Sequence, residues 1–256
     1  MPYFQAVIHI KTIADIQIYR RIAKCSVTFR GKIGMFKVEL TRLTSSNVVE
    51  LGTLLAYGQR VTMLSIDIQA LSITQCFRLF SNLRFPNLTC FSTQTLPHEG
   101  LDKFISRHPT MSVITLGPCN RVGPHCALQS TGALQQLEEV RGEFKCISNL
   151  VSRATHRIFA DVSTTHEFGY PELFKKISDV DAGVRLLSME FTPSDTEVMP
   201  RLAAALPGVS TLRLVQFIDG VTALNAQSCR HFTDKRAYRQ SIPVDIPGIR
   251  WHGAGT

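Results

Sequence analysis

The 256-residue sequence has no long hydrophobic run and no recognisable leader. No stretch approaches the roughly 18–20 uncharged apolar residues that a membrane-spanning helix needs, so we expect no membrane segment. Lys11 and Asp15 interrupt the apolar-rich beginning, and no small-residue cleavage site follows it, so we expect no secretory signal. The chain is therefore expected in the cytoplasm or the nucleus.

Paired cysteine motifs and catalytic motifs are also missing. The seven cysteines are an odd number at irregular spacings without a C-x-x-C pair, which indicates free thiols in a reducing compartment. The sequence contains no G-x-G-x-x-G or G-x-x-x-x-G-K-[ST] phosphate loop, no G-x-S-x-G elbow and no H-E-x-x-H pair. We therefore expect neither an enzyme nor a cofactor.

The densest group of metal-ligating side chains comprises Cys119, His125 and Cys126. Zinc needs four ligands in tetrahedral reach, and no second C-x-x-C or H-x-x-x-H pair accompanies these three. A cysteine activated by histidine would need a third, orienting group, which the sequence does not indicate. We therefore predict no metal site and no catalytic site here, only a loop between two structural units.

The sequence does contain an internal repeat of the form L-x-x-L-x-L, in which any apolar residue can take an L position. The full copies begin at Met35, Val61, Met111, Val184 and Val209. Weaker copies begin at Leu88, Leu137 and Thr155. Successive copies begin on average about 25 residues apart, inside the leucine-rich-repeat range of roughly 20–29 residues.

Apolar residues with helical spacing follow most copies, as at Ile73, Phe77 and Phe80. Successive units of one strand and one helix can pair their strands only in parallel, with the helices covering the apolar side of the sheet. The sequence therefore predicts an α/β fold: an irregular leucine-rich-repeat-like solenoid, or horseshoe, with parallel strands on one face and helices on the other. A doubly wound α/β domain is the alternative, although its phosphate-binding glycine motifs are missing.

One unit also carries the polar position of a leucine-rich repeat. Met111, Ile114 and Leu116 precede Cys119 in the form L-x-x-L-x-L-x-x-N/C, which predicts a structural role for a buried Cys119 thiol. Another unit has Gln69 at this position. We therefore expect no regular asparagine ladder.

Several runs along the chain have the phrasing of a known family. They are FPNLT at residues 85–89, LPH at 96–98, FISRHP at 104–109 and LAAALPGVSTLRL at 202–214. Together they resemble the leucine-rich-repeat region of fungal F-box proteins, over about residues 3–217. The resemblance implies a non-enzymatic scaffold for protein interactions, which corresponds to the substrate-recognition part of an F-box ubiquitin-ligase adaptor.

The resemblance also sets the expected boundaries. Residues 3–10 look like the first strand after an F-box, and no F-box precedes them in the printed sequence. A Skp-type linker protein is therefore an expected partner only if an F-box lies upstream. We expect about eight or nine repeat units over residues 1–220 and a basic, loosely ordered tail over residues 221–256.

The net charge of +8 is concentrated at the two ends of the chain. Residues 1–43 have eight basic and two acidic groups, residues 44–220 have fifteen and sixteen, and residues 221–256 have five and two. Basic ends suggest a nucleic-acid-associated protein as the alternative function. The cluster of Arg20, Arg21 and Lys24 has no interleaved aromatic residues, so a solvated helix is the favoured interpretation and nucleic acid is not an expected partner.

Binding residues are expected on the concave face of the sheet. In each strand, the side chains between the core positions point away from the helices. The residues that we predict to bind a protein substrate on this face are Lys37, Glu39, Asp67, Thr115, Arg141, Glu190 and Arg213. Such a mixture of charged and small polar groups suits protein recognition.

Overall fold

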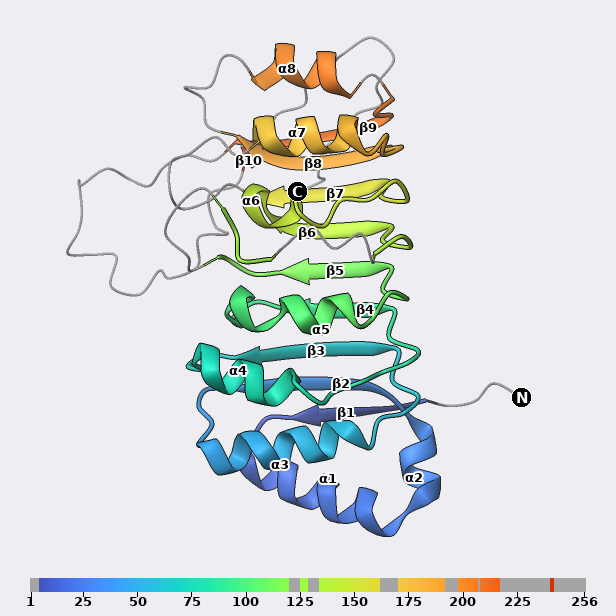
Figure 1. The fold of residues 1–256 in the computed structure, drawn as a ribbon, viewed down its shortest axis with the longest axis vertical. Helices are drawn as coiled ribbons and strands as arrows, with labels where there is room; N and C mark the ends of the chain where they lie inside the picture. Colours follow the sequence, from blue (N-terminus) through green and yellow to red (C-terminus); the bar gives the residue numbers. More distant parts are fainter. Residues whose placement is uncertain are drawn as a thin grey trace, which may run out of the picture.

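The computed structural model describes residues 5–119, 125–128, 134–161, 170–191, 198–206, 208–216 and 240–241. These residues form an α/β fold in which the strands of a single sheet alternate with helices along the chain (Figure 1). The tail predicted over residues 221–256 lies outside the described residues, apart from 240–241. No helix in the described part of the chain is long and apolar enough to cross a membrane.

Nine strands of the sheet run parallel and lie side by side in chain order. They are β1 (Ala6–Ile10), β2 (Ile33–Leu40), β3 (Met63–Ile68), β4 (Cys90–Thr93), β5 (Val113–Leu116), β6 (Glu139–Glu143), β7 (Arg157–Asp161), β8 (Leu186–Phe191) and β9 (Thr211–Gln216). The short strand β10 (Gln240–Ser241) pairs antiparallel with β9. Among the described strands the order never reverses, so they do not contain the switch point of a doubly wound domain.

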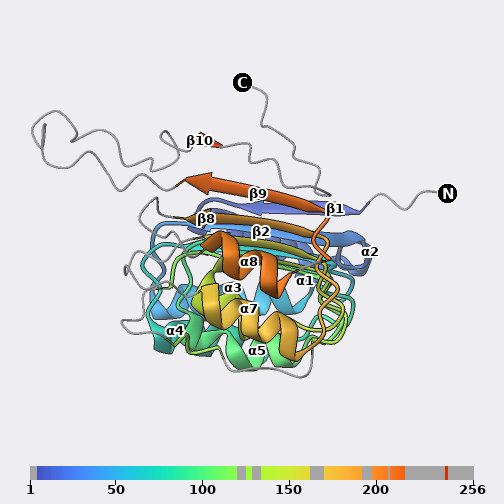
Figure 2. The same cartoon turned by 90° about the horizontal axis from the view of Figure 1, so that it is seen from above.

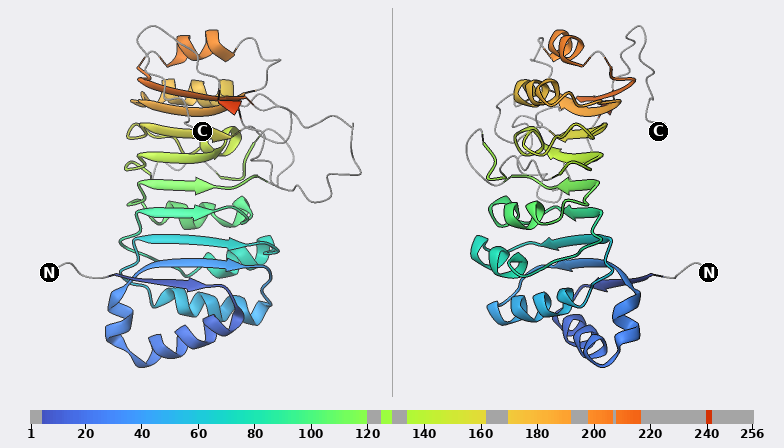
Figure 3. Two further views of the ribbon diagram at one scale, coloured as in Figure 1. Left: turned by 180° about the vertical axis from the view of Figure 1, so that it is seen from behind. Right: turned by 45° about the vertical axis from the view of Figure 1, so that its right-hand side comes forward.

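Helices lie between most consecutive strands, although none is described between β5 and β6. They are α1 (Ile13–Cys25), α2 (Val27–Lys32), α3 (Ser45–Ala56), α4 (Ile73–Phe80), η1 (His98–Gly100), α5 (Asp102–Ser106), α6 (Phe144–Ile147), α7 (Tyr170–Asp179) and α8 (Val198–Ala205). Figure 2 shows α1, α3, α4, α5, α7 and α8 on one side of the strands, and the right-hand view of Figure 3 shows the same two layers. The expected alternation of strands with helices is confirmed.

The helices begin where the sequence supplies capping residues. At the start of α1, Thr12 accepts from the backbone of Asp15, and the Asp15 carboxylate accepts from the backbone of Thr12. Ser72 and Gln75 form the same reciprocal pair at the start of α4. Each pair satisfies backbone N–H groups that the first turn of a helix leaves free.

The core lies between the sheet and the helices. The strand residues that face it align in register across the sheet: Phe36, Leu64, Phe91, Ile114, Val140, Ile158, Leu187 and Leu212. All eight side chains are buried. All except Phe36 occupy the second position of their predicted units, so the repeat pattern in the sequence corresponds to one row of the core.

One core position predicted for the strands is wrong. The sequence pattern predicts that a unit begins at Met35 and that the next begins at Val61, so these two residues should be neighbours. In the structure Met35 instead pairs with Met63, two residues after Val61. The corresponding first position in β2 is therefore Ile33, which is completely buried. Met35 is half-buried and lies on the other face of the sheet.

Aromatic side chains fill the core between α4, α5 and β4. The Phe104 ring lies 4.7 Å from the ring of Phe80 and 5.2 Å from that of Phe91. His108 belongs to the same group, with its ring 4.3 Å from that of Phe104. Its Nε2 accepts the backbone N–H of Phe85 at 2.9 Å, so its Nδ1 donates to the Phe104 carbonyl at 2.7 Å. Both nitrogens of the neutral ring are thus satisfied.

Candidate functional site

The face of the sheet opposite the helices, which we refer to as the open face, carries the side chains that alternate with the core positions. One such residue from each strand lies in a row across the sheet: His9, Lys37, Ser65, Ser92, Thr115, Arg141, Phe159, Ser188 and Arg213. Neighbouring strands are about 4.8 Å apart, so the side chains of this polar row are adjacent. The register therefore places Lys37, Thr115, Arg141 and Arg213, four of the predicted binding residues, in one line.

Two further predicted residues, Glu39 and Asp67, form a small acidic group beside this row, where they face each other across β2 and β3. The Glu39 carboxylate lies 2.7 Å from Lys37 Nζ and 2.6 Å from His9 Nε2. These hydrogen bonds, first that of Lys37 and then that of His9, lower the pKa of Glu39. Glu39 is therefore ionised and held in place at neutral pH.

Asp67 has a different environment from Glu39. Partial burial raises the pKa of its carboxyl group, and the nearby charge of Glu39 acts in the same direction. The backbone N–H of Gln94 donates to Asp67 and partly offsets this effect. Asp67 thus joins the open face to the chain that leaves β4.

Arginine and glutamate side chains are mixed on the part of the open face formed by β6 to β9. Arg141 and Arg213 are exposed, and neither forms an ion pair with another described residue. Arg157 is paired, with its Nε 3.1 Å from Glu139 Oε2. Glu190, the remaining predicted residue, lies in β8 opposite Val215, and only its backbone position is described.

A row of apolar side chains runs beside the polar row over β1 to β5. It comprises Val7, Met35, Met63, Cys90 and Val113, which occupy matching positions in the register. Val7 is 61% exposed and Met63 43% exposed, although both are large hydrophobic residues. The sequence analysis missed this apolar row because it considered only charged and polar residues as candidates.

The basic cluster of the first helix is partly neutralised. Arg20 Nη1 lies 3.0 Å from Glu50 Oε1 of α3, so one of its three cationic groups has an acidic partner within the protein. This ion pair joins two helices of the same layer. It favours the interpretation of the cluster as a solvated helix surface.

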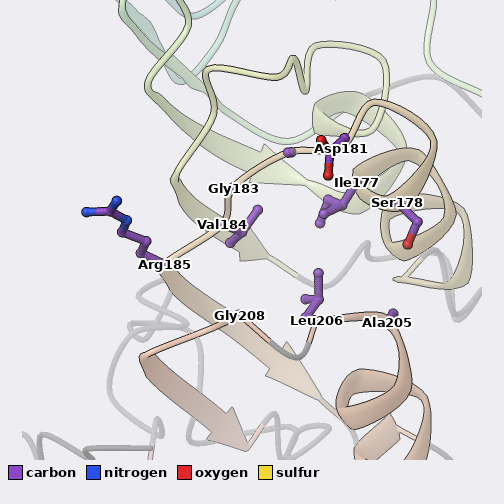
Figure 4. Close-up of a pocket in the computed structure, with 10 residues that line it drawn as sticks. Ile177, Ser178, Asp181, Gly183, Val184, Arg185, Ala205, Leu206 and Gly208 are labelled. Carbon is purple, nitrogen blue, oxygen red and sulfur yellow. The ribbon is translucent and has the colours of Figure 1, made fainter.

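A pocket of about 420 Å³ lies between α7, α8 and the start of β8 (Figure 4). Ile177, Val184 and Leu206 line it, whereas the Arg185 side chain points away from it. Its polar side chains are Ser178 and Asp181, and Asp181 pairs with Arg153 at 3.7 Å. The pocket is therefore a gap between two adjacent units without a converging set of reactive groups.

A second group of interest is the buried cluster of His98, Cys119, Cys126 and Cys146, which we refer to as the Cys-His cluster. One nitrogen of His98 and the three sulfur atoms all lie within 4.8 Å of one another. His98 Nδ1 is 3.3 Å from Cys126 Sγ and 3.4 Å from Cys146 Sγ. Cys119 Sγ is 3.9 Å from Cys126 Sγ. The parallel sheet brings these four groups together because they follow the carboxyl ends of β4, β5 and β6.

Two groups of the Cys-His cluster have shifted pKa values. Burial lowers the pKa of His98, but hydrogen bonds with Cys119 and Cys126 outweigh burial and raise it to about 9. Hydrogen bonds with the same two groups, together with burial, raise the pKa of Cys146. The other ring nitrogen of His98, Nε2, has no hydrogen-bond partner among the residues that the structure describes.

A buried ion pair lies next to the cluster. Glu143 is the last residue of β6, and Lys145 lies in α6. Both side chains are buried, and the distance between Lys145 Nζ and Glu143 Oε2 is 3.8 Å. Burial raises the pKa of Glu143, and the backbone N–H of Cys119 donates to its carboxylate. Glu143 therefore fixes the backbone of one member of the cluster.

The structure brings together only part of the ligand group considered from the sequence. Cys119 and Cys126 meet, whereas His125 is exposed and is replaced by His98 and Cys146 from neighbouring units. One feature of the sequence indicates that these ligands lie close together. The third position of the repeat is Leu116, Gly142 or Thr93 in the three units. Cys119, Cys146 and His98 follow these positions by three, four and five residues, respectively.

Comparison with known proteins adds no family assignment. The chain matches none of the protein-family models against which it was compared. A search of curated proteins likewise gave no significant match.

Proposed function

We propose that this protein is a non-enzymatic scaffold that binds another protein through the open face of its sheet. In this proposal the strand-and-helix units stack as an irregular leucine-rich-repeat solenoid, and successive strands supply successive parts of one binding surface. The observation that carries the proposal is the apolar row on the open face, from Val7 to Val113, beside a row of polar and charged residues.

The two rows place apolar and polar side chains next to each other, which is a combination that protein interfaces use. Interfaces combine an apolar centre, which supplies affinity, with a polar rim, which supplies orientation and a faster association rate. On the open face Met63 is a flexible apolar side chain at the centre of the apolar row, and methionine is common at adaptable binding surfaces. The acidic pair of Glu39 and Asp67 and the basic pair of Arg141 and Arg213 lie towards opposite ends of the sheet.

The same separation of charge suggests the chemistry of the partner. A segment with a basic residue opposite Glu39 and Asp67 and acidic residues opposite Arg141 and Arg213 would complement the open face. The resemblance to the repeat region of F-box proteins adds a cellular role, in which the bound protein is a substrate for ubiquitin ligation. A Skp-type linker is part of this proposal only for a gene product that also contains an F-box.

A matched pair of surface variants tests the binding face. Met63→Glu places a charge in the apolar row, and Phe77→Glu places one on α4, on the helix side; the two native side chains are 43% and 42% exposed. Candidate partners are first identified by proximity labelling in cells. The affinity of the partner that binds directly is then measured by calorimetry with purified proteins. We expect Met63→Glu to weaken binding at least about tenfold, equivalent to about 1.4 kcal/mol, and Phe77→Glu to leave it unchanged.

Two results would contradict the proposal. In the first, Phe77→Glu abolishes binding while Met63→Glu retains it, which would move the interface to the helices. In the second, the ligand is a nucleic acid whose affinity falls steeply with salt, which would favour the basic alternative. The adaptor role is tested separately, because a full-length gene product with an intact F-box should co-purify with a Skp-type linker.

A further inference from the structure

We propose that His98, Cys119, Cys126 and Cys146 bind one zinc ion, which joins three consecutive strand units at the carboxyl edge of the sheet. This inference does not depend on the proposed binding function. It rests on four buried ligand groups whose donor atoms converge on one point.

The distances match a tetrahedral zinc site. Zn–S bonds of about 2.3 Å and Zn–N bonds of about 2.05 Å at tetrahedral angles give S–S edges of about 3.8 Å and S–N edges of about 3.6 Å. In the Cys-His cluster the S–S distance between Cys119 and Cys126 is 3.9 Å, and the N–S distances from His98 are 3.3 and 3.4 Å. A polynuclear iron–sulfur cluster would hold its cysteines further apart, so these edges fit a single ion.

The donor set also selects the metal. Three thiolates and one imidazole are soft and borderline ligands, which bind zinc in preference to magnesium or calcium. Three cysteines and one histidine are one of the usual ligand sets of structural zinc sites. Since all four positions are filled by protein groups, none is left for a water molecule or a substrate, and the ion has a structural rather than a catalytic role.

Groups around the cluster stabilise bound thiolates. The backbone N–H of Leu128 donates to Cys126 Sγ at 3.4 Å, and such outer hydrogen bonds orient the ligands of metal sites. Zinc with three thiolates and one neutral imidazole carries one net negative charge. Lys145, in the same turn as Cys146, is 5% exposed and pairs with Glu143, so this neighbouring ion pair adds no net charge to the site when both groups are ionised.

The topology explains what the ion would do. His98 begins η1 after β4, Cys119 and Cys126 belong to the chain that follows β5, and Cys146 lies in α6 after β6. The described residues have only four-residue strands in β4 and β5, so the sheet is narrow there. One ion with ligands from all three units would stabilise the packing of these units against one another.

Metal content is the first test. The full chain and the variants Cys146→Ala and Cys76→Ala are purified under reducing conditions from zinc-supplemented cells. The zinc content of each protein is measured by plasma mass spectrometry. Cys146 and Cys76 are both completely buried and both lie in helices, but only Cys146 belongs to the cluster. We expect one zinc per chain in the wild type and in Cys76→Ala, and loss of zinc in Cys146→Ala.

A second measurement avoids variants that fail to fold. In the wild-type chain, a mercurial thiol reagent should release one zinc per chain. X-ray absorption should report three sulfur neighbours at about 2.3 Å and one nitrogen at about 2.0–2.1 Å. Cobalt substituted for zinc should show thiolate charge-transfer absorption and the intense visible bands of tetrahedral coordination.

Three results would overturn the inference. The first is a wild-type chain that binds no stoichiometric zinc even after reconstitution under reducing conditions. The second is zinc that remains when Cys146 is replaced. The third is a metal-free chain two hydrogens lighter than its sequence mass in which peptide mapping links Cys119 to Cys126, which would replace the zinc site by a disulfide.

Discussion

His108 offers a sharp test of the packing between two neighbouring units. It is 2% exposed, accepts from the backbone of Phe85 and donates to the carbonyl of Phe104. In His108→Ala the buried N–H of Phe85 loses its acceptor, which costs about 1–3 kcal/mol. The lost ring contacts with Phe104 and Phe85 leave a cavity that adds about 1–2 kcal/mol. We expect the free energy of unfolding to fall by about 3 kcal/mol in total.

The unfolding free energy is measured by urea titration at pH 7.5 with circular dichroism as the probe. His108→Gln is the matched variant, because its side chain retains an acceptor and a donor while it loses the ring. It should cost less than His108→Ala, by about 1 kcal/mol or more. A loss below about 1 kcal/mol in His108→Ala would refute the reasoning, since a buried hydrogen-bonded ring cannot be removed so cheaply.

The pH dependence of this effect has a definite sign. Burial lowers the pKa of His108 below its ordinary value of 6.5, and the charges of Arg107 and Arg84 act in the same direction. The unfolded chain therefore binds the proton more readily, so the contribution of His108 is complete above pH 6.5 and decreases as the pH falls below it. The stability difference between wild type and His108→Gln should shrink from pH 7.5 to pH 5. A difference that stays constant over this range would show that His108 titrates normally.

Two further predictions concern close packing, and urea unfolding checks both. A Cβ atom at Gly117 would overlap the backbone carbonyl of Gln94, so Gly117→Ala should destabilise the fold by at least about 2 kcal/mol, whereas Gly183→Ala, in open space, should be nearly neutral. Equal effects of the two glycine variants would contradict this. Phe104→Ala should cost about 3–5 kcal/mol because the ring is fully buried, and Phe77→Ala should change stability by about 0.5 kcal/mol or less because that ring is 42% exposed. A small loss for Phe104→Ala would mean that its aromatic group is loosely packed.

The candidate sites differ in how far the sequence could predict them. Lys37, Thr115 and Arg141 were predicted to lie on one surface from the sequence, because alternation along a strand decides which face a side chain occupies. Met35 was placed wrongly because β2 fits the repeat pattern in two ways. The pattern can begin at Ile33 and continue with Phe36 and Val38, or begin at Met35 and continue with Val38 and Leu40. Only the pairing of β2 with β3 decides between the two alignments.

The Cys-His cluster could not be found from spacing along the chain. Zinc motifs are recognised when ligands lie two to four residues apart, whereas His98, Cys119 and Cys146 are separated by more than twenty residues. Their proximity depends on a parallel sheet, in which the carboxyl ends of successive strands meet at one edge. The search along the sequence therefore chose His125, the nearest histidine in the chain, over His98, the nearest one in space.

Local patterns in the sequence are enough to predict that strands and helices alternate and that the strands run parallel, in chain order if the units form a repeat. The physical reason is local, since apolar residues at strand and helix spacings recur in each unit and short connections permit one kind of pairing. Tertiary structure alone decided which side chains of different units become neighbours. Contacts such as those between His98 and Cys146, or between Val7 and Met35, depend on the exact register of stacked units, which no single unit specifies.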